Sequence, residues 1–319
     1  MNIAAYTLGI PKIDSLLDLS NAINLSEYTL QRILNSVDDQ YYLIKIPKKD
    51  NSFREVYSPS PALKAIQKWI LENILQPIAV DPSATAFQKG VTIRNNVELH
   101  IDNQFLLCMD IKDFFPSIKK NRVYQLFRSV GYDEHISLVF SRFCTYKEFL
   151  PQGAVTSPSI SNIISIKLDR RLNGYCSLRN IVYSRYADDF TFSSNNTDKL
   201  RKSINILKAI IEDEGYTLNT SKTRLLIPGN KRKVTGLIIS DSKSISIGRK
   251  QRRILRAKIH HSIFKMEKNT DSWRLFNKHI NGWLSFLKGI DYESYISLLK
   301  YRENLKQKKK EQEDIISVF

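Results

Sequence analysis

The stretch Ser184-Arg185-Tyr186-Ala187-Asp188-Asp189-Phe190 decides the fold of this chain. Residues 181–186 and 190–193 are rich in β-forming side chains, so the two acids are expected at the tip of a hairpin. Adjacent carboxylates repel each other and raise their own pKa; a divalent cation such as Mg²⁺, which prefers carboxylate oxygens, removes that repulsion. The competing interpretation is an Asp-Asp turn selected for turn propensity alone.

A third acid, Asp110, ends the apolar run at residues 105–109. A buried strand rarely ends in an acid that has no partner. If this strand pairs with the hairpin, Asp110 and Asp188 converge and can hold two metal ions roughly 4 Å apart, the arrangement that activates a hydroxyl and stabilises a leaving pyrophosphate. Asp113 follows three residues later. It could serve the triphosphate region, but a structural salt bridge is the favoured interpretation.

The chain has 319 residues and a net charge of +17, and the excess is concentrated near its C-terminus. Residues 231–319 hold 21 Lys and Arg against 9 Asp and Glu. This excess favours a polyanionic partner, either nucleic acid or an anionic membrane surface; a solvated charge-rich surface is the alternative. Hydrophobic residues make up 42% of the chain, which argues for a substantial core and against disorder.

The cysteines and the apolar segments indicate the compartment. Cys108, Cys144 and Cys176 have no zinc-site spacing, and their odd number argues against a disulfide framework, so free thiols are expected. Residues 1–10 lack the pattern of a signal peptide, and no apolar run approaches the roughly 20 residues that span a bilayer. We therefore expect a soluble cytoplasmic protein without membrane association.

The periodicities predict an α+β fold. Strands are expected in two pieces over 40–57, around a turn-like cluster at residues 48–51, and over 105–111, 181–186, 190–193, 223–227, 234–239 and 244–247. Helices are expected over 13–37 with Ser26 as an internal cap, and over 61–75, 121–130, 157–172, 198–214 and from 249 onward. This order indicates a sheet domain that carries the acids and a helical, basic C-terminal domain.

Three ordered motifs give the pattern a family resemblance. Asp110-Ile-Lys-Asp113-Phe-Phe115, then Pro151-Gln152-Gly153-x-x-x-Ser157-Pro158, then Tyr186-Ala187-Asp188-Asp189 resemble motifs A, B and C of reverse transcriptases. The resemblance implies a right-hand polymerase fold: a helical N-terminal extension over 1–38, fingers and palm over 39–240, and a thumb with an RNA-binding region over 241–319. It also implies that Asp110 and Asp188 bind two Mg²⁺ ions, that Asp189 supports the site, and that the carbonyl of Ile111 is a backbone ligand.

The resemblance extends to the nucleotide-binding side of the site. The aromatic that Phe115 matches packs under the sugar and excludes a 2′-hydroxyl, which lost space and an unsatisfied polar group are enough to achieve. A core phenylalanine is the alternative, and one of Phe114 and Phe115 is expected in the core. Gln152 precedes a glycine and a helix start, so its amide can reach the templating pair, and Gly153 permits close backbone approach.

Basic side chains complete the expected nucleotide site. Arg54 matches a fingers position that grips the incoming triphosphate, a task that suits the forked guanidinium. Lys45 is a weaker companion. Lys222 lies in a segment that resembles motif D, and a lysine there could protonate the leaving pyrophosphate; a plain surface lysine is the equally weighted alternative.

The segment after residue 248 predicts an amphipathic helix with a basic face. Four residues form one narrow stripe and apolar side chains form a neighbouring one, as a thumb that tracks a duplex requires. An ordinary amphipathic surface helix is the alternative. The basic stripe consists of Arg249, Arg253, Arg256 and His260.

Two further segments resemble bacterial retron reverse transcriptases. Val234-Thr235-Gly236 is similar to their VTG signature, and Asn96-Val97-Glu98-Leu99-His100 is similar to their NAxxH motif, with Val97 in place of the alanine. The resemblance implies RNA contacts from Asn96 and His100. It implies reverse transcription with dNTPs of a cognate structured non-coding RNA (msr-msd), primed by the 2′-hydroxyl of an internal guanosine.

The expected product is branched multicopy single-stranded DNA (msDNA), and the expected biological role is anti-phage defence with an effector protein. Two alternatives stay open at this point. One is a group II intron-like or diversity-generating reverse transcriptase. The other is a non-catalytic RNA-binding scaffold.

Overall fold

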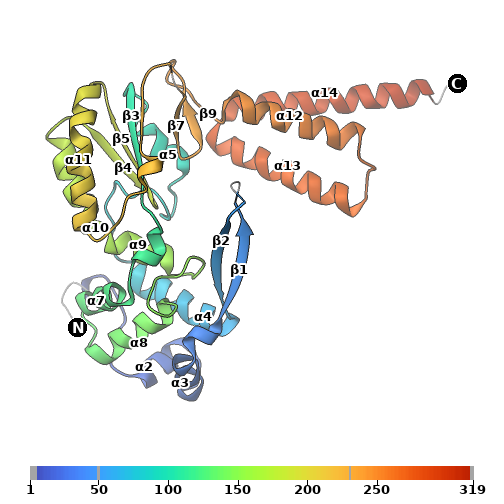
Figure 1. The fold of residues 1–319 in the computed structure, drawn as a ribbon. Helices are drawn as coiled ribbons and strands as arrows, with labels where there is room; N and C mark the ends of the chain where they lie inside the picture. Colours follow the sequence, from blue (N-terminus) through green and yellow to red (C-terminus); the bar gives the residue numbers. More distant parts are fainter. Residues whose placement is uncertain (1–5, 49–50, 230, 317–319) are drawn as a thin grey trace. The chain divides into compact units, whose positions relative to one another are not determined.

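The computed structural model describes residues 6–48, 51–229 and 231–316. The chain forms two compact units (Figure 1). Unit 1 comprises Met1–Val91 and Leu107–Arg224, and unit 2 comprises Thr92–Leu106 and Leu225–Phe319. The predicted domain boundaries after residues 38 and 240 stay predictions. In the described part of the chain, no helix combines the length and the apolar character needed to cross a bilayer.

Unit 1 begins with the predicted helical segment. Helices α2 (Leu16–Ile23) and α3 (Glu27–Asn35) are followed by the 3-10 turn η1 (Val37–Gln40). The predicted cap is confirmed, because the Ser26 hydroxyl accepts a hydrogen bond from the amide of Thr29. The N-terminal residues 1–5 of the segment examined for a signal peptide lie outside the described residues.

A long hairpin and a helix come next. Strands β1 (Tyr41–Pro47) and β2 (Phe53–Pro59) pair antiparallel, with Ile46 opposite Arg54. Residues 49 and 50 of the turn predicted between them lie outside the described residues. Helix α4 (Pro61–Ile70) starts with proline in its first turn and continues into a π-helical turn, η2 (Leu71–Leu75).

The sheet that carries the acids has four strands in the order β4-β5-β3-β6. Its strands are β3 (Phe105–Asp110), β4 (Val182–Tyr186), β5 (Asp189–Ser194) and β6 (Arg224–Leu226). The helices of the same part of the chain are α6 (Phe114–Ser117), α7 (Lys120–Val130), α8 (Glu134–Cys144), α9 (Ser157–Ile164), α10 (Ile166–Ser177) and α11 (Thr197–Asp213), with the 3-10 turn η3 (Thr220–Lys222) after them. The segment 157–172, predicted as one helix, forms two helices, because the helix is interrupted at Ser165.

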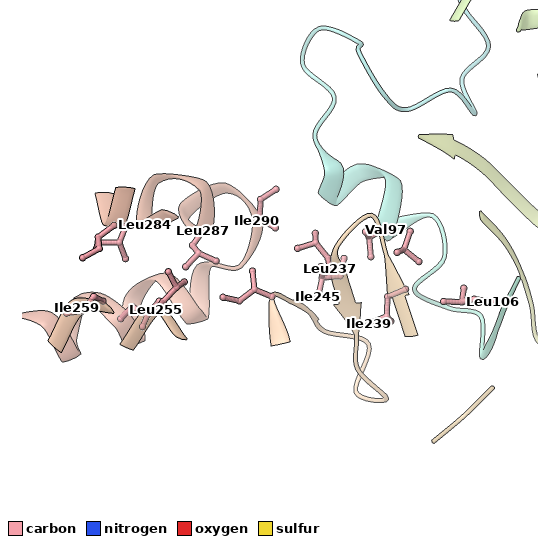
Figure 2. Packing of buried hydrophobic residues seen from close by; sticks show 14 residues of the cluster. Val97, Leu106, Leu237, Ile239, Ile245, Leu255, Ile259, Leu284, Leu287 and Ile290 are labelled. Carbon is pink, nitrogen blue, oxygen red and sulfur yellow. The ribbon is translucent and has the colours of Figure 1, made fainter. Parts of the chain in front are cut away.

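Unit 2 combines a small sheet with helices. Its elements are α5 (Ile93–Glu98), β7 (Arg232–Val234), β8 (Leu237–Ile239), β9 (Ile245–Ser246), α12 (Gly248–Phe264), α13 (Asp271–Ile290) and α14 (Tyr292–Ile316). Helices α12, α13 and α14 pack against one another (Figure 1). One buried cluster runs from the small sheet into these helices and includes Leu237, Ile245, Leu255 and Leu287 (Figure 2).

The predicted strand over 234–239 is instead a tight hairpin. Val234 pairs with Leu237, and the two residues between them both have positive φ, 45° at Thr235 and 94° at Gly236. Two consecutive positive φ angles are the requirement of a type I′ turn, the turn that suits two-residue hairpins. The VTG segment is therefore a hairpin turn, in which glycine supplies one of the two left-handed positions.

The thiols are as predicted. Cys108, Cys144 and Cys176 are all free. Burial raises the pKa of the Cys108 thiol to about 11 and that of the Cys144 thiol to about 12, so neither is a reactive thiolate near neutral pH.

Candidate active site

The two acids stand at the tip of the β4–β5 hairpin, as predicted. Tyr186 pairs with Asp189, which leaves Ala187 and Asp188 as the two turn residues. Ala187 has a φ of 56°, an uncommon value for a residue with a side chain. The positive φ falls on the first turn residue, as in a type II′ turn. The short turn fixes the backbone that carries Asp188.

Backbone hydrogen bonds bring Asp110 to this turn. The amide of Ile111 donates to the carbonyl oxygen of Asp188 at 3.0 Å, and strand β5 lies next to β3 in the sheet. On its other side the carbonyl of Asp110 accepts from the amide of Asn219 at 2.8 Å. The expected convergence of Asp110 and Asp188 is confirmed, because rigid backbone fixes both residues.

Burial and neighbouring negative charge raise the pKa of Asp188 and of Asp189. Partial withdrawal from water, followed by the charges of Asp188 and Asp110, raises the pKa of Asp189 to about 6. The pKa of Asp188 is also raised, mainly by burial and then by the charge of Asp110, while Lys222 and Arg54 act in the opposite direction. Such a cluster has an unmet demand for positive charge.

Lys222 meets part of that demand in this structure. Its ammonium group lies 2.8 Å and 2.9 Å from the two carboxylate oxygens of Asp110, and this contact raises the pKa of Lys222. Asp110 itself is only 6% exposed. A cation therefore already sits on the carboxylate that the motif resemblance assigns to metal binding, which shows that this donor set accepts positive charge.

The donors suit Mg²⁺ in kind, since they are carboxylate oxygens and the backbone carbonyl of Ile111. Among the residues that the structure describes, however, no three acidic, histidine or cysteine side chains are already grouped as a metal-binding cluster. Lys222 holds both oxygens of Asp110. A metal that uses this carboxylate therefore competes with Lys222 for its oxygens.

A buried ion pair, which was not predicted, lies next to the acid turn and is hydrogen-bonded to its backbone. Arg185 and Asp169 are both fully buried. The guanidinium donates to both Asp169 oxygens, from Nε at 2.8 Å and from Nη2 at 2.6 Å. Its Nη1 reaches Asn162 at 3.1 Å and the carbonyl of Ala187, in the acid turn, at 3.3 Å. One side chain thus connects helices α9 and α10 to the backbone next to Asp188.

The aromatic pair after Asp110 divides as expected. Phe114 is 3% exposed and packs against Phe115 and Tyr216, so it is the core member. Phe115 is only partly buried, and its ring lies 6.3 Å from that of Phe87. Phe87 itself is 49% exposed and has a positive φ of 61°. Phe115 therefore keeps part of its surface accessible, and Phe87 is a neighbour that the motifs did not indicate.

Gly153 fits a close backbone approach. Its φ is +121°, and an added Cβ would stand 2.7 Å from Val56 Cγ1 and 2.8 Å from the carbonyl oxygen of Tyr57. The carbonyl of Gln152 accepts a 2.7 Å hydrogen bond from the amide of Tyr57. The predicted close approach at Gly153 is confirmed, and the segment that approaches is strand β2.

Strand β2 carries the expected triphosphate ligand. Arg54 is exposed, and its charge acts against the raised pKa of Asp188. Lys45, its weaker companion, is exposed on β1 opposite Glu55. The contacts of Gly153 therefore fix the strand that presents Arg54.

The prediction of a structural salt bridge at Asp113 is wrong for the residues that the structure describes. No ion pair involves this residue within the described parts of the chain. Asp113 instead has left-handed backbone, with φ 48° and ψ 49°, and starts the short helix α6, where its carbonyl accepts from the amide of Ser117. An exposed aspartate at a sharp strand-to-helix turn needs no cationic partner.

The residues predicted to contact RNA fall into two groups, both in unit 2. Asn96 and His100 are fully buried, which leaves them no surface for direct RNA contact in this structure. Asn96 instead donates toward the Thr235 hydroxyl at 3.5 Å and so joins the two signature-like segments. These two side chains are structural because both lie in the interior of unit 2.

The second group has the predicted amphipathic arrangement. The basic stripe of α12 (Arg249, Arg253, Arg256 and His260) is exposed, while Leu255 and Ile259 are buried. The guanidinium of Arg256 lies 4.3 Å above the ring of Tyr301. This stripe is available to a phosphate backbone.

Known proteins that resemble this chain point to one group. The sequence profile of the family described as reverse transcriptase (RNA-dependent DNA polymerase) matches residues 46–255. The chain is 40% identical to Retron Ec86 reverse transcriptase of Escherichia coli, over 94% of this chain and 92% of that protein. It is 32% identical to Retron Mx162 reverse transcriptase of Myxococcus xanthus, over 79% and 60% of the two chains, and 30% identical to Retron Ec83 reverse transcriptase of Escherichia coli, over 79% and 83%.

Proposed function

Because this chain belongs to the retron reverse transcriptases, a family of RNA-directed DNA polymerases with the right-hand fold, we propose that it copies a structured non-coding RNA of its own locus. Synthesis starts from the 2′-hydroxyl of an internal guanosine and yields branched msDNA. The observation that carries the proposal is the 40% identity to a retron enzyme over nearly the whole chain. This relationship favours a retron enzyme over a group II intron-like or diversity-generating reverse transcriptase.

Asp110 and Asp188, with the carbonyl of Ile111, would hold two Mg²⁺ ions, and Asp189 supports them. The bound metals supply charge that lowers the pKa of the attacking hydroxyl and stabilises the leaving pyrophosphate. The chain's own contribution is positional: the hydrogen bond from Ile111 to Asp188 holds the two acid-bearing strands together. The guanidinium of Arg185 restrains the turn by donating a hydrogen bond to the carbonyl of Ala187.

Lys222 has two positions in this proposal. Before metal binding its ammonium neutralises Asp110. Once released, it can donate a proton to the departing pyrophosphate, and its side chain is 54% exposed and therefore able to move. The close contact with Asp110 favours this role over that of a plain surface lysine.

In this proposal, residues of the fingers bind the triphosphate of the nucleotide, and an aromatic side chain selects its sugar. Arg54 grips the triphosphate, with Lys45 as a weaker companion, and Gln152 lies beside the templating pair. The accessible face of Phe115 packs under the sugar. Replacing Phe115 with alanine is expected to admit ribonucleotides, measured as the ratio of rNTP to dNTP incorporation; an unchanged ratio would remove Phe115 as the gate.

The msr-msd RNA, the msDNA product, an effector protein, a role in anti-phage defence and a cytoplasmic location all belong to the proposal. Their support is the family relationship, and the exposed basic stripe of α12 supports RNA binding. A non-catalytic scaffold is the second candidate. The three acids Asp110, Asp188 and Asp189 speak against it, because carboxylates beside a polyanion weaken binding unless they hold metal.

The decisive experiment is to purify the full chain with its bound nucleic acid and to sequence what it carries. A small RNA joined to DNA by a 2′–5′ link supports the proposal. DNA without such a branch would contradict guanosine priming while leaving polymerase activity intact. Asp188→Ala and Asp189→Ala variants should carry the RNA but no DNA, and primer extension by the Asp188→Ala enzyme would show that the assigned site is wrong.

A further inference from the structure

Unit 2 contains a large basic pocket that the acid site does not use. Its volume is about 920 Å³, and its walls come from three separate segments: residues 94–101, residues 231–252 and the start of α14. Ile245, which is labelled in Figure 2, is one of its apolar wall residues. Six cationic side chains line it: Arg94, Lys231, Lys243, Arg249, Lys250 and Arg252.

Most of this charge is not neutralised by the protein. Lys243 pairs with Asp102 and Arg94 with Glu98. The other four cations have no carboxylate partner in the described part of the chain. Four uncompensated cations around one cavity create a field that attracts a polyanion.

The acids of the pocket do not cancel this field. Asp291 is 5% exposed, and its two oxygens accept hydrogen bonds from the amides of Ile247 and Ser294, each at 3.0 Å. Its charge is thus engaged with the backbone at the starts of α12 and α14. Only Glu293 remains as a second acid of the lining.

One aromatic side chain suggests what kind of polyanion fits. Tyr292 lines the pocket and is 58% exposed, so part of its ring is open to solvent. Exposed rings beside basic side chains are typical of sites that bind unpaired bases, because each base can stack on the ring while its phosphate meets a cation. A concave pocket with cations on several walls suits a bent single strand better than a straight duplex.

We infer that this pocket binds the sugar-phosphate backbone at a single-stranded turn of a folded RNA, with one base stacked on Tyr292. The inference rests on the proposed function, since it assigns a site to the RNA. The segment that contains the buried Asn96 and His100 contributes two of the lining residues, Arg94 and Ile101. The pocket recognises the loop of the RNA, while the members of the α12 stripe outside the pocket, Arg253, Arg256 and His260, can follow a duplex.

The test uses the full chain and two probes: an RNA hairpin with a single-stranded loop, and the same stem as a blunt duplex. The pocket variant is Lys231→Ala/Arg252→Ala. The matched control is Lys278→Ala/Lys288→Ala, which removes the same charge from exposed positions of α13 outside the pocket. Extension of a generic primed template checks that each variant is folded and active.

The pocket variant should bind the hairpin more weakly than the control, and the slope of log affinity against log salt should fall by about 1.4, which is about 0.7 for each lost phosphate contact with a single strand. Tyr292→Ala should weaken hairpin binding roughly tenfold with an unchanged slope. Duplex binding should be the same in all variants.

Equal hairpin binding by the pocket and control variants would overturn the inference without touching the proposal of branched DNA, which the sequencing experiment tests. Competition by poly-glutamate as strong as that by the hairpin would also overturn it, since the pocket would then suit an acidic protein segment.

Discussion

The buried pair of Arg185 and Asp169 offers the sharpest test of how the acid turn is held. Both side chains are 0% exposed, and two hydrogen bonds of 2.8 Å and 2.6 Å join them. Removing one partner leaves a buried charge without compensation, which costs about 3–5 kcal/mol. Asp169→Asn and Arg185→Met should therefore each lower the free energy of unfolding by that amount, measured by urea denaturation.

The double variant separates the ion pair from its surroundings. With both charges gone, its loss of stability should be smaller than the sum of the two single losses by about 3 kcal/mol. Single losses that add to within about 0.5 kcal/mol would refute the reasoning, because an additive pair is an uncoupled pair.

Tyr183→Phe is the matched control for activity. The Tyr183 hydroxyl donates to Asp169 at 2.7 Å but does not touch the acid turn, so its loss should cost about 2 kcal/mol and leave catalysis intact. Arg185→Met also removes the donor to the Ala187 carbonyl. At a temperature where Arg185→Met and Tyr183→Phe are both folded, Arg185→Met should raise the Mg²⁺ concentration needed for half-maximal primer extension. Equal Mg²⁺ requirements in the two variants would show that Arg185 is merely structural.

Three further predictions concern single positions. Gly153→Ala should destabilise the chain by at least about 2 kcal/mol in thermal unfolding, because its Cβ would meet strand β2, whereas Gly174→Ala, with nothing within 4 Å of the added carbon, should be neutral or stabilising. Lys222→Met should lower the Mg²⁺ concentration for half-maximal binding while slowing turnover; a raised Mg²⁺ requirement would contradict competition for Asp110. Burial lowers the pKa of His100 to about 3, so the unfolded chain takes up a proton below about pH 6.5 that the folded chain refuses. Stability should then fall by about 2 kcal/mol between pH 6.5 and pH 5, and His100→Gln should remove that dependence, as urea midpoints at the two pH values would show.

Local patterns were sufficient to predict the centre of the site. The hairpin, the strand that ends at Asp110 and the amphipathic α12 all follow from short-range periodicity, and each is present. The split between a core Phe114 and an accessible Phe115 was also expected, and it holds because neighbouring side chains of the short helix α6 point in different directions.

Features that depend on distant partners were not predictable in this way. Asp169 lies on a helix and Arg185 on a strand, and each looks like a surface charge until the fold buries them together. The sequence around Thr235 predicts a continuous strand, because threonine favours strands, and the φ of 45° at Thr235 shows a turn instead. The motif resemblance implies RNA contacts from Asn96 and His100, and nothing in the local sequence indicates that both side chains are completely buried.

The excursion of residues 92–106 into unit 2 has a consequence for synthesis on the ribosome. Val97 and Leu106 belong to a cluster whose other buried members all lie at or after residue 234. The intervening segment 107–224 takes on the order of 10 s to translate, and during that time these two side chains lack the other buried members of their cluster. A nascent chain that stalls within this window presents an apolar stretch to chaperones and proteases. Residues 92–106 are therefore protected only after the last third of the chain has been synthesised and can pack against them.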